Sequence, residues 1–200
     1  LLIVVPAMFL IGYGVNKFLV QPVLNKEADV REPVGALLLT ASVSIVVDNV
    51  ILATFGGDYR TIKTSFSDAT VTFLGVTNGL SRVYAFVLCI IVTAIFYWIM
   101  NKTEIGRQIR AVGQDRNAAK LMGINIGKTF NIAFGMGMAL LGTAGVALLP
   151  FNQLYPTIGG LFGTTAFVTV VLGGLGSIPG AIIGGLLIGT IFSLFIVPLV

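Results

Sequence analysis

Four long apolar runs, separated by polar stretches, dominate the chain, and a fifth apolar region follows them. The runs cover residues 1–20, 34–55, 81–100 and 129–149. The hydrocarbon core of a bilayer is about 30 Å thick and takes about 20 apolar residues in helical form to cross. Each run therefore predicts a membrane-spanning helix.

The fifth region, residues 164–200, is too long for one span and contains a segment rich in glycine at residues 173–180. At about 1.5 Å per residue, a helix over residues 164–172 is about 13–14 Å long, which is too short to cross. Residues 181–197 come closer to a full span. The pattern predicts an all-α fold, a polytopic transmembrane helix bundle of about five to six segments with a broken or re-entrant C-terminal helix.

Composition excludes most other classes of protein. Hydrophobic residues make up 56% of the 200 residues and charged residues 10%, against roughly 45–50% and about 25% in soluble domains. The chain has no histidine and one cysteine, Cys89, so histidine-based catalysis, an intrachain disulfide and a CxxC site are absent. We predict no catalytic residue and no metal ligand. Because the chain begins inside an apolar run at Leu1, we also expect that an N-terminal part is missing.

The distribution of cations predicts the orientation in the membrane. Residues 101–128 carry six cations and residues 17–33 carry three, and two spans separate these stretches, which puts them on the same side. The opposite side carries three. Since cytoplasmic loops are enriched in Lys and Arg, residues 101–128 are predicted to be cytoplasmic and residues 56–80 and 150–163 external. The net charge of +4 is explained by these loops, and no nucleic-acid partner is expected.

The segment 101–128 is long for a bare connection. Asp115 suits the N-cap of a short helix and Gly123 suits its C-terminal stop. Between them lie the small residues Ala118 and Ala119, followed by an apolar end. Two interpretations are open: a short helix that packs closely against a partner protein, or a solvated basic loop that only sets topology.

Residues 123–129 resemble a phosphate-binding loop, but three residues separate the two glycines where the motif has four, and no strand precedes them. We therefore predict no nucleotide site and no cofactor in this chain, and no enzymatic activity of its own.

Three blocks resemble a known family. They are residues 106–125 (GRQIRAVGQDRNAAKLMGIN), 134–145 (FGMGMALLGTAG) and 166–185 (AFVTVVLGGLGSIPGAIIGG). They resemble the permease subunits of branched-chain amino-acid ABC importers, most closely the H-type subunit. Two positions depart from the family pattern: Gln-Pro-Val-Leu at residues 21–24 replaces an Arg-Pro-Leu-Arg element, and Asn117 stands where glutamate is common.

The resemblance implies a single, partial permease domain over residues 1–200, located in a bacterial inner membrane, with residues 101–128 as its cytoplasmic coupling loop. It implies transport of leucine, isoleucine or valine delivered by an external solute-binding protein. It also implies a second permease subunit, in a hetero- or homodimer, and two cytoplasmic ATPase subunits that bind the ATP.

In this family the short helix of the loop sits in a groove of an ATPase subunit. The residues that the resemblance assigns to this coupling are Gln114, Asp115, Arg116, Ala118, Ala119, Lys120, Leu121 and Gly123.

Asp48 and Asn49 lie within the second apolar run, past its midpoint toward the outside. An ionisable group at this depth is costly and usually faces the bundle interior or water. The two residues either line the translocation path or make interhelical or interfacial hydrogen bonds.

The break at residues 173–180 contains Gly176, Ser177 and Pro179. Irregular backbone at membrane depth is tolerated only where protein or a watery cavity satisfies it, so these residues are candidates for the path. The alternative is a tight loop at the cytoplasmic surface. Asn131, near the start of a span, is expected to be an interfacial cap.

Small residues recur on one face of two predicted helices, which favours close helix packing in membranes. The glycines expected at such contacts are Gly142, Gly145, Gly180 and Gly184.

Two other transport functions compete with the importer for branched-chain amino acids. A permease of the same family could carry urea, another amide or a sugar. A secondary transporter or channel would normally show intramembrane carboxylates or an inverted repeat, and one aspartate without a clear repeat argues against it.

Overall fold

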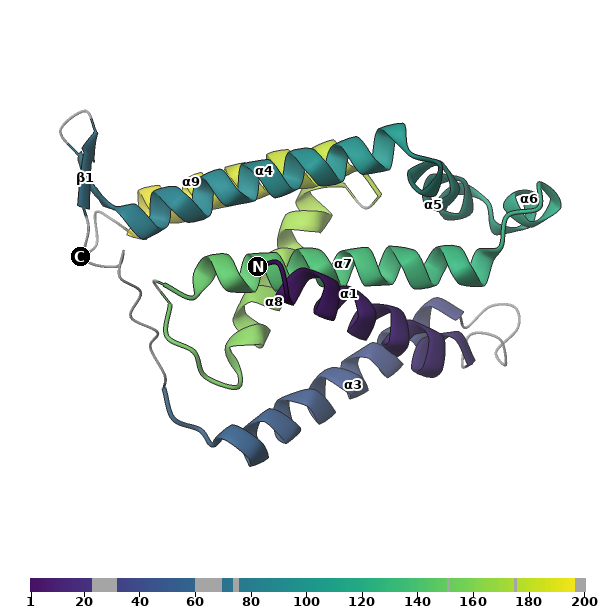
Figure 1. The fold of residues 1–200 in the computed structure, drawn as a ribbon, viewed down its shortest axis with the longest axis horizontal. Helices are drawn as coiled ribbons and strands as arrows, with labels where there is room; N and C mark the ends of the chain where they lie inside the picture. The colour runs from purple at the N-terminus through teal and green to yellow at the C-terminus, as the bar shows by residue number, and fades with distance from the viewer. Residues whose placement is uncertain (23–31, 60–69, 74–75, 151, 175, 197–200) are drawn as a thin grey trace. The chain divides into compact units, whose positions relative to one another are not determined.

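The computed structural model describes residues 1–22, 32–59, 70–73, 76–150, 152–174 and 176–196. It consists mainly of helices (Figure 1), with a short β-hairpin between two of them. The elements in order are α1 (Val4–Val15), η1 (Asn16–Val20), α3 (Glu32–Phe55), β1 (Thr70–Phe73), β2 (Val76–Gly79), α4 (Leu80–Lys102), α5 (Glu104–Gln114), α6 (Arg116–Leu121), α7 (Ile126–Leu148), α8 (Ile158–Gly173) and α9 (Ile178–Ile196). Contacts divide the chain into two compact units, Leu1–Leu154 and Tyr155–Val200.

Within the described residues, three helices are long and apolar enough to cross a membrane: Leu38–Phe55, Leu80–Lys102 and Ile126–Leu148. Shorter apolar helices cover Val4–Val20, Ile158–Gly173 and Ile178–Leu194. The predicted polytopic helix bundle is confirmed.

The hairpin of β1 and β2 was not predicted. It is antiparallel, with Thr70 opposite Gly79 and Phe73 opposite Val76. It falls within residues 56–80, where the sequence predicted only an external connection. Its strands contain β-branched residues, which favour extended structure, but two four-residue strands are too short for a clear alternating pattern.

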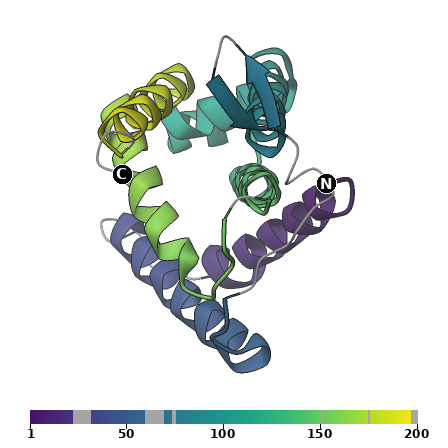
Figure 2. The same ribbon diagram turned by 90° about the vertical axis from the view of Figure 1, so that its left-hand side faces the viewer.

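Close packing between α1 and α7 forms the centre of the first unit, and Figure 2 shows α7 between α1 and α4. Gly12 and Gly142 permit this approach: an added Cβ would lie 2.6 Å from Met138 Cβ and 2.7 Å from Met8 Cγ, respectively. Small residues at such contacts let helix backbones approach in membranes. Gly145, which was also expected to pack, is exposed, and an added Cβ there would meet no atom within 4 Å.

In the second unit, α8 begins at Ile158 rather than at residue 164, so part of the predicted external connection 150–163 is helical. Gly159 and Gly160 lie in the first turn of this helix, and glycine lowers helix propensity in water. In an apolar environment the backbone must satisfy its own hydrogen bonds, and this favours helix even over two glycines.

The predicted break between the last two helices is present. Gly174 and Gly176 adopt φ angles of +91° and +92°, which residues with a Cβ rarely adopt. The backbones of Gly173 and Gly180 touch across the turn. Gly184 follows, where an added Cβ would lie 2.8 Å from the carbonyl oxygen of a residue of α8.

Candidate functional site

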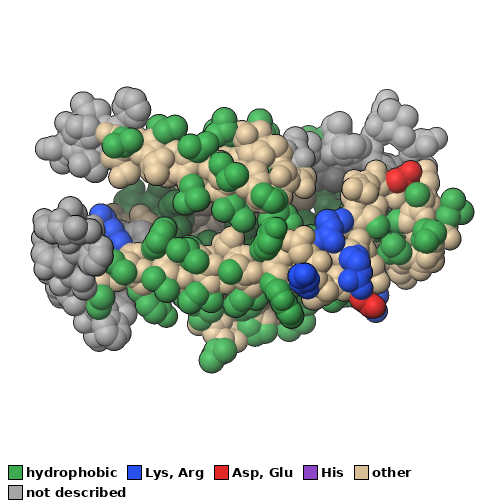
Figure 3. All heavy atoms as spheres, turned by 90° about the horizontal axis from the view of Figure 1, so that it is seen from above, with side chains coloured by type: hydrophobic (Ala, Val, Ile, Leu, Met, Phe, Trp, Pro, Cys, Tyr) green, Lys and Arg blue, Asp and Glu red, His purple; other side chains and the backbone are tan. Residues whose placement is uncertain are grey.

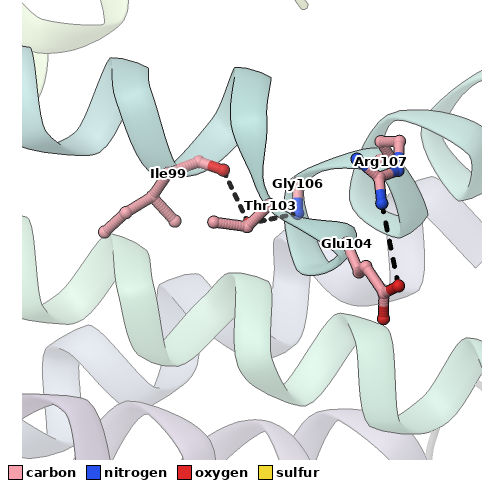
Figure 4. A network of polar contacts seen from close by, with 5 residues as sticks. All are labelled: Ile99, Thr103, Glu104, Gly106 and Arg107. Carbon is pink, nitrogen blue, oxygen red and sulfur yellow. Dashed lines mark hydrogen bonds and ion pairs between the residues drawn. The ribbon is translucent and has the colours of Figure 1, made fainter.

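A tight elbow joins α4 to α5, and Thr103 forms it. The hydroxyl of Thr103 donates to the carbonyl oxygen of Ile99 at 2.6 Å and accepts from the backbone N–H of Gly106 at 3.2 Å (Figure 4). One hydroxyl therefore satisfies groups at the end of one helix and the start of the next. The nearby ion pair between Arg107 and Glu104, at 3.8 Å, is largely exposed and adds little.

Arg110 ties α5 back to the end of α4. Its guanidinium donates to the carbonyl oxygen of Met100 and lies 3.5 Å from Oδ1 of Asn101. The last carbonyls of a helix lack helical partners, and a cation there also complements the helix dipole. Gly106 is buried against the Met100 backbone, where an added Cβ would clash. The junction between α4 and α5 is thus held by the side chains of Thr103 and Arg110 and by the close approach of Gly106 to the Met100 backbone.

The start of α6 is capped by Asp115. Its Oδ1 accepts from the backbone N–H groups of Asn117 at 2.8 Å and Ala118 at 3.0 Å. The predicted N-cap is present, and Asn117 takes part through its backbone.

The end of α6 is a Schellman motif. The N–H of Ile124 donates to the carbonyl of Ala119 and the N–H of Gly123 to the carbonyl of Lys120, each at 3.1 Å. Gly123 has φ +80°, the left-handed conformation that this motif needs. With both ends satisfied, six residues hold a defined helix.

The two alanines of α6 lie in different environments. Ala119 is only 3% exposed, whereas Ala118 is exposed. The sequence predicted that both would face a partner, but Ala119 is covered by this chain itself. The outward surface instead ends in Leu121 and Met122, which are 89% and 83% exposed.

The remaining residues assigned to coupling are also exposed: Gln114, Asp115, Arg116, Lys120 and Gly123. Lys and Arg side chains gather on the part of the structure that carries α5 and α6, at the right of Figure 3. The guanidinium carbon of Arg116 lies 5.0 Å from the ring centroid of Phe130 on α7, so a cation–π contact joins α6 to the next span.

The candidates for the translocation path lie on separate elements. Asp48 is half-buried on α3, while Asn49 donates to the carbonyl of Ile45 on its own helix at 2.7 Å. Ser177 caps α9, because its hydroxyl accepts from the N–H of Gly180 at 3.1 Å.

The other two path candidates flank that cap. Gly176 belongs to the turn with positive φ, and Pro179 lies in the first turn of α9, where a missing N–H is harmless.

A buried amide network links η1 to α7, and sequence reasoning missed it. Nδ2 of Asn16 donates to Oδ1 of Asn131 at 2.7 Å, and Nδ2 of Asn131 lies 3.3 Å from Oε1 of Gln21. Both asparagines are 4% exposed. The expectation that Asn131 is an interfacial cap is wrong, because Asn125 caps α7 by accepting from Lys128 N–H at 3.0 Å. Polar residues in two apolar runs were a signal, but their pairing needs the tertiary fold.

Asn16 also begins the π-helix η1, in which the N–H of Gln21 donates to the carbonyl of Asn16. Such single-turn insertions re-aim side chains and are frequent at functional positions. A cavity of about 400 Å³ adjoins this point, lined by Asn16, Phe130, Ala133, Phe134, Gly137, Met138 and Leu141.

The sequence matches the family described as branched-chain amino acid transport system permease component over residues 1–199. The chain belongs to this family. Family membership and the apolar helices together confirm the predicted multi-pass location in the inner membrane.

Relatives agree with this assignment. BraD of Pseudomonas aeruginosa, a high-affinity branched-chain amino acid transport system permease protein, is 30% identical over 183 residues, which cover 89% of this chain and 58% of BraD. LivH of Escherichia coli, described in the same words, is 31% identical over 184 residues, with the same two coverages. The ribose import permease protein RbsC of Haemophilus influenzae is 33% identical over 141 residues, 66% of this chain and 44% of RbsC.

The chain spans 58% of the length of BraD and LivH, less than two thirds of each. No solved structure gives a significant match. The family and these relatives are described as permease components or permease proteins of transport systems.

Proposed function

We propose that this chain is the permease subunit of an ATP-driven importer for branched-chain amino acids. An external binding protein delivers the amino acid, and two separate cytoplasmic ATPase subunits bind and hydrolyse ATP. A second permease subunit, identical or related, completes the pathway. Membership in the family and the similarity to BraD and LivH support this proposal.

The exposed apolar end of α6 is the observation that carries the coupling role. Leu121 and Met122 are adjacent, are 89% and 83% exposed, and stand at the C-terminal end of a helix that is capped at both ends. Large apolar side chains held outward on a rigid helix are suited to fill a groove of a partner. A loop that only sets membrane topology needs neither the caps nor the apolar end.

The connections around α6 suit the transmission of movement. On one side, α5 is fixed to α4 through Thr103 and Arg110. On the other side, Arg116 contacts Phe130 of α7. A displacement of α6 by an ATPase would therefore reach two membrane helices directly.

Cysteine crosslinking tests the coupling role. In the full-length protein with Cys89 replaced by serine, we would introduce Ala118→Cys or Met122→Cys and co-express the ATPase subunits. Both positions are expected to crosslink to the ATPase in a manner that changes with ATP. Gly113→Cys is the matched control, because Gly113 is exposed on the neighbouring helix α5 with free space around it. If both cysteines on α6 are labelled freely from the cytoplasm and neither crosslinks to the ATPase, the segment 101–128 only sets topology and the coupling role is wrong.

For the translocation path we propose Asp48 and Asn49 together with the turn at Gly176, Ser177 and Pro179. Asp48 is an ionisable side chain in the span Leu38–Phe55, and such groups usually face a polar interior. Asp48→Asn in the complete transporter should lower uptake at unchanged membrane abundance. Asp58→Asn, outside the span, serves as the control. Equal uptake by both variants would show that Asp48 does not line the path.

Sugar import is the second candidate function, because RbsC is 33% identical over 66% of this chain. Uptake of labelled leucine, isoleucine, valine and ribose by the complete transporter separates the two. Competition by branched-chain amino acids alone is expected. Uptake of ribose alone would replace the proposed substrate while leaving the coupling role intact.

A further inference from the structure

The contact that α1 and η1 make with α7 is apolar at one end and polar at the other. On α7 the contacting residues recur every three or four positions, which is the spacing of one helix face: Gly127, Asn131, Gly135, Met138 and Gly142. At the polar end their partners are Asn16 and Gln21, which are five positions apart. Because an α-helix turns by about 100° per residue, residues five apart point about 140° away from each other. A regular α-helix would therefore bring only one of these two amides to α7.

The π-helix η1 brings both amides to the same face. The N–H of Gln21 donates to the carbonyl of Asn16, a bond that spans one residue more than in an α-helix. Residues 16 and 21 thus lie one turn apart. The side chain of Gln21 reaches Asn131 and lies against the backbone of Gly127, where it leaves no room for a Cβ. The extra residue therefore selects Gln21 for this contact, since in an α-helix the residue one turn after Asn16 is Val20.

The two amide contacts are held with different strength. Asn16 donates to Asn131 at 2.7 Å, and both side chains are 4% exposed. The contact between Asn131 and Gln21 is longer, at 3.3 Å, and Gln21 is half-buried. Separating the two asparagines would leave two amides without partners in apolar surroundings, which is costly. Releasing Gln21 costs less, because the asparagine pair stays intact and the Gln21 amide can bond to water.

The polar end of the contact lies beside the segment that we propose for ATPase docking. Helix α7 begins only five positions after α6 ends. The guanidinium carbon of Arg116 in α6 lies 5.0 Å from the ring centroid of Phe130, and Asn131 is the next residue. Gln21 rests on Gly127 in the first turn of α7. A displacement of α6 therefore acts first on the part of α7 that Gln21 holds.

From this arrangement we propose that Gln21 is a latch between η1 and α7 that closes and opens in the transport cycle. In the closed state η1 is the π-helix seen here, and Gln21 lies on Asn131. In the open state η1 winds as an α-helix, Val20 takes the place one turn after Asn16, and Gln21 rotates away by about 100°. The pair of Asn16 and Asn131 stays closed in both states and is the pivot. This inference rests on the proposed coupling role of α6, for which Gln21 is a positioning residue.

Deleting Leu19 tests whether the latch has to open. After the deletion Gln21 is the fourth residue after Asn16, so a regular α-helix holds it on Asn131 and rewinding can no longer release it. The Leu19 side chain is 43% exposed, so the deletion removes little packing. We expect the full-length variant to melt at the wild-type temperature or above, and uptake by the complete transporter to fall about tenfold or more. A stable variant with wild-type uptake would overturn the proposal.

Deletion of Ala28 is the matched control. It also shortens the chain between η1 and α3 by one residue, but it leaves residues 16–21 unchanged. Uptake should stay within about twofold of wild type. An equal loss of uptake in both deletion variants would show that the length of this connection matters rather than the π-helix, and would also overturn the proposal.

A reversible crosslink tests the latch without changing the chain length. In full-length protein with Cys89→Ser, Gln21→Cys and Gly127→Cys would be joined by a short, reducible, bifunctional thiol reagent. Cysteine is shorter than glutamine, so it makes room for the new Cβ at residue 127. Linking should lower uptake about tenfold relative to the same unlinked protein, and reduction should restore it. Unchanged uptake in the linked protein would show that the contact is static and that no latch exists.

The control crosslink lies at the apolar end of the same contact. Met8→Cys with Gly142→Cys uses a place where an added Cβ at Gly142 would lie 3.1 Å from Met8 Cβ. Linking this pair should leave uptake unchanged, because α1 and α7 stay together in both states. If it stops uptake as completely as the first link, the two helices separate along their whole length and the pivot is wrong.

Uptake and ATP hydrolysis by the unmodified complete transporter separate this inference from the function on which it rests. A transporter that neither imports branched-chain amino acids nor hydrolyses ATP would remove the proposed function. A working transporter whose uptake survives both the Leu19 deletion and the link from residue 21 to residue 127 would remove only the latch.

Discussion

The side-chain amide of Asn16 donates to Oδ1 of Asn131 over 2.7 Å, and 115 positions of sequence separate the two residues. Both are 4% exposed, and one begins a π-helix while the other lies in a membrane-span candidate. Gly12 and Gly142 already allow α1 and α7 to pack closely, so the amide pair adds specificity to an existing contact. A polar pair in an apolar interface favours one register over its neighbours.

A double-mutant cycle measures this pair. Asn131→Leu alone should lower the free energy of unfolding in detergent by about 1–3 kcal/mol, because it leaves the Asn16 amide buried without its partner. The double variant Asn16→Leu with Asn131→Leu should cost less than the sum of the single changes, since neither buried asparagine amide is then left without the other. Additive losses would show that the two amides do not act on each other.

The contact between Gly135 and Phe9 should be intolerant of even one methyl group. An added Cβ at Gly135 would lie 3.0 Å from the backbone oxygen of Phe9, which cannot rotate away. Gly135→Ala should therefore destabilise the protein by about 1–3 kcal/mol. Gly145→Ala, on the same helix in open space, should be neutral or stabilising by up to about 1 kcal/mol. Thermal unfolding of the two variants in one detergent compares them, and equal melting temperatures would refute the close contact.

The Asp115 cap should decide whether α6 stays folded. Asp115→Ala removes both hydrogen bonds to the first turn and should cost about 1 kcal/mol, with faster hydrogen exchange in residues 117–121. Asp115→Asn keeps an acceptor of similar quality and should preserve protection. If Asp115→Ala exchanges at the wild-type rate, tertiary contacts rather than the cap hold α6.

A valine substitution tests the Thr103 elbow without changing the size of the side chain. Thr103→Val removes the hydroxyl that bonds Ile99 and Gly106 and should lower stability by about 1 kcal/mol. Thr103→Ser retains the hydroxyl and should stay within about 0.5 kcal/mol of wild type. The valine variant loses only the hydroxyl, and the serine variant loses only the methyl group. Chemical denaturation of both variants therefore shows which of the two groups stabilises the elbow.

The turn between α8 and α9 should depend on its two glycines with positive φ. Gly176→Ala, at φ +92°, should cost about 1–2 kcal/mol because a Cβ is strained in that region. Gly163→Ala within α8 has open space around it and should not destabilise. Thermal unfolding of both variants provides the comparison, and a harmless Gly176→Ala would mean that the turn relaxes to another conformation.

Several features followed from local patterns alone. Apolar runs about 20 residues long predicted the helices now seen as α3, α4 and α7, since membrane thickness imposes that length. Asp115 and Gly123 predicted the two ends of α6, because capping chemistry depends on residues only a few positions apart.

Other features were not accessible in this way. Gly142 packs while Gly145 faces open space, although both lie on α7 in similar apolar sequence. Ala118 is exposed and Ala119 is buried, although they are adjacent and identical. Periodicity indicates that one face of a helix packs, but the neighbouring helix decides which face it is.

The sequence by itself determined the membrane class, the long spans, the basic segment 101–128 and the ends of α6, because each depends on length, composition or short-range hydrogen bonding. Only the tertiary structure decided that Asn16 meets Asn131, that Arg116 covers Phe130 and that a cavity lies between Asn16 and α7. These contacts join segments about 14 to 115 positions apart, and their pairing is set by how helices pack, which no local pattern encodes.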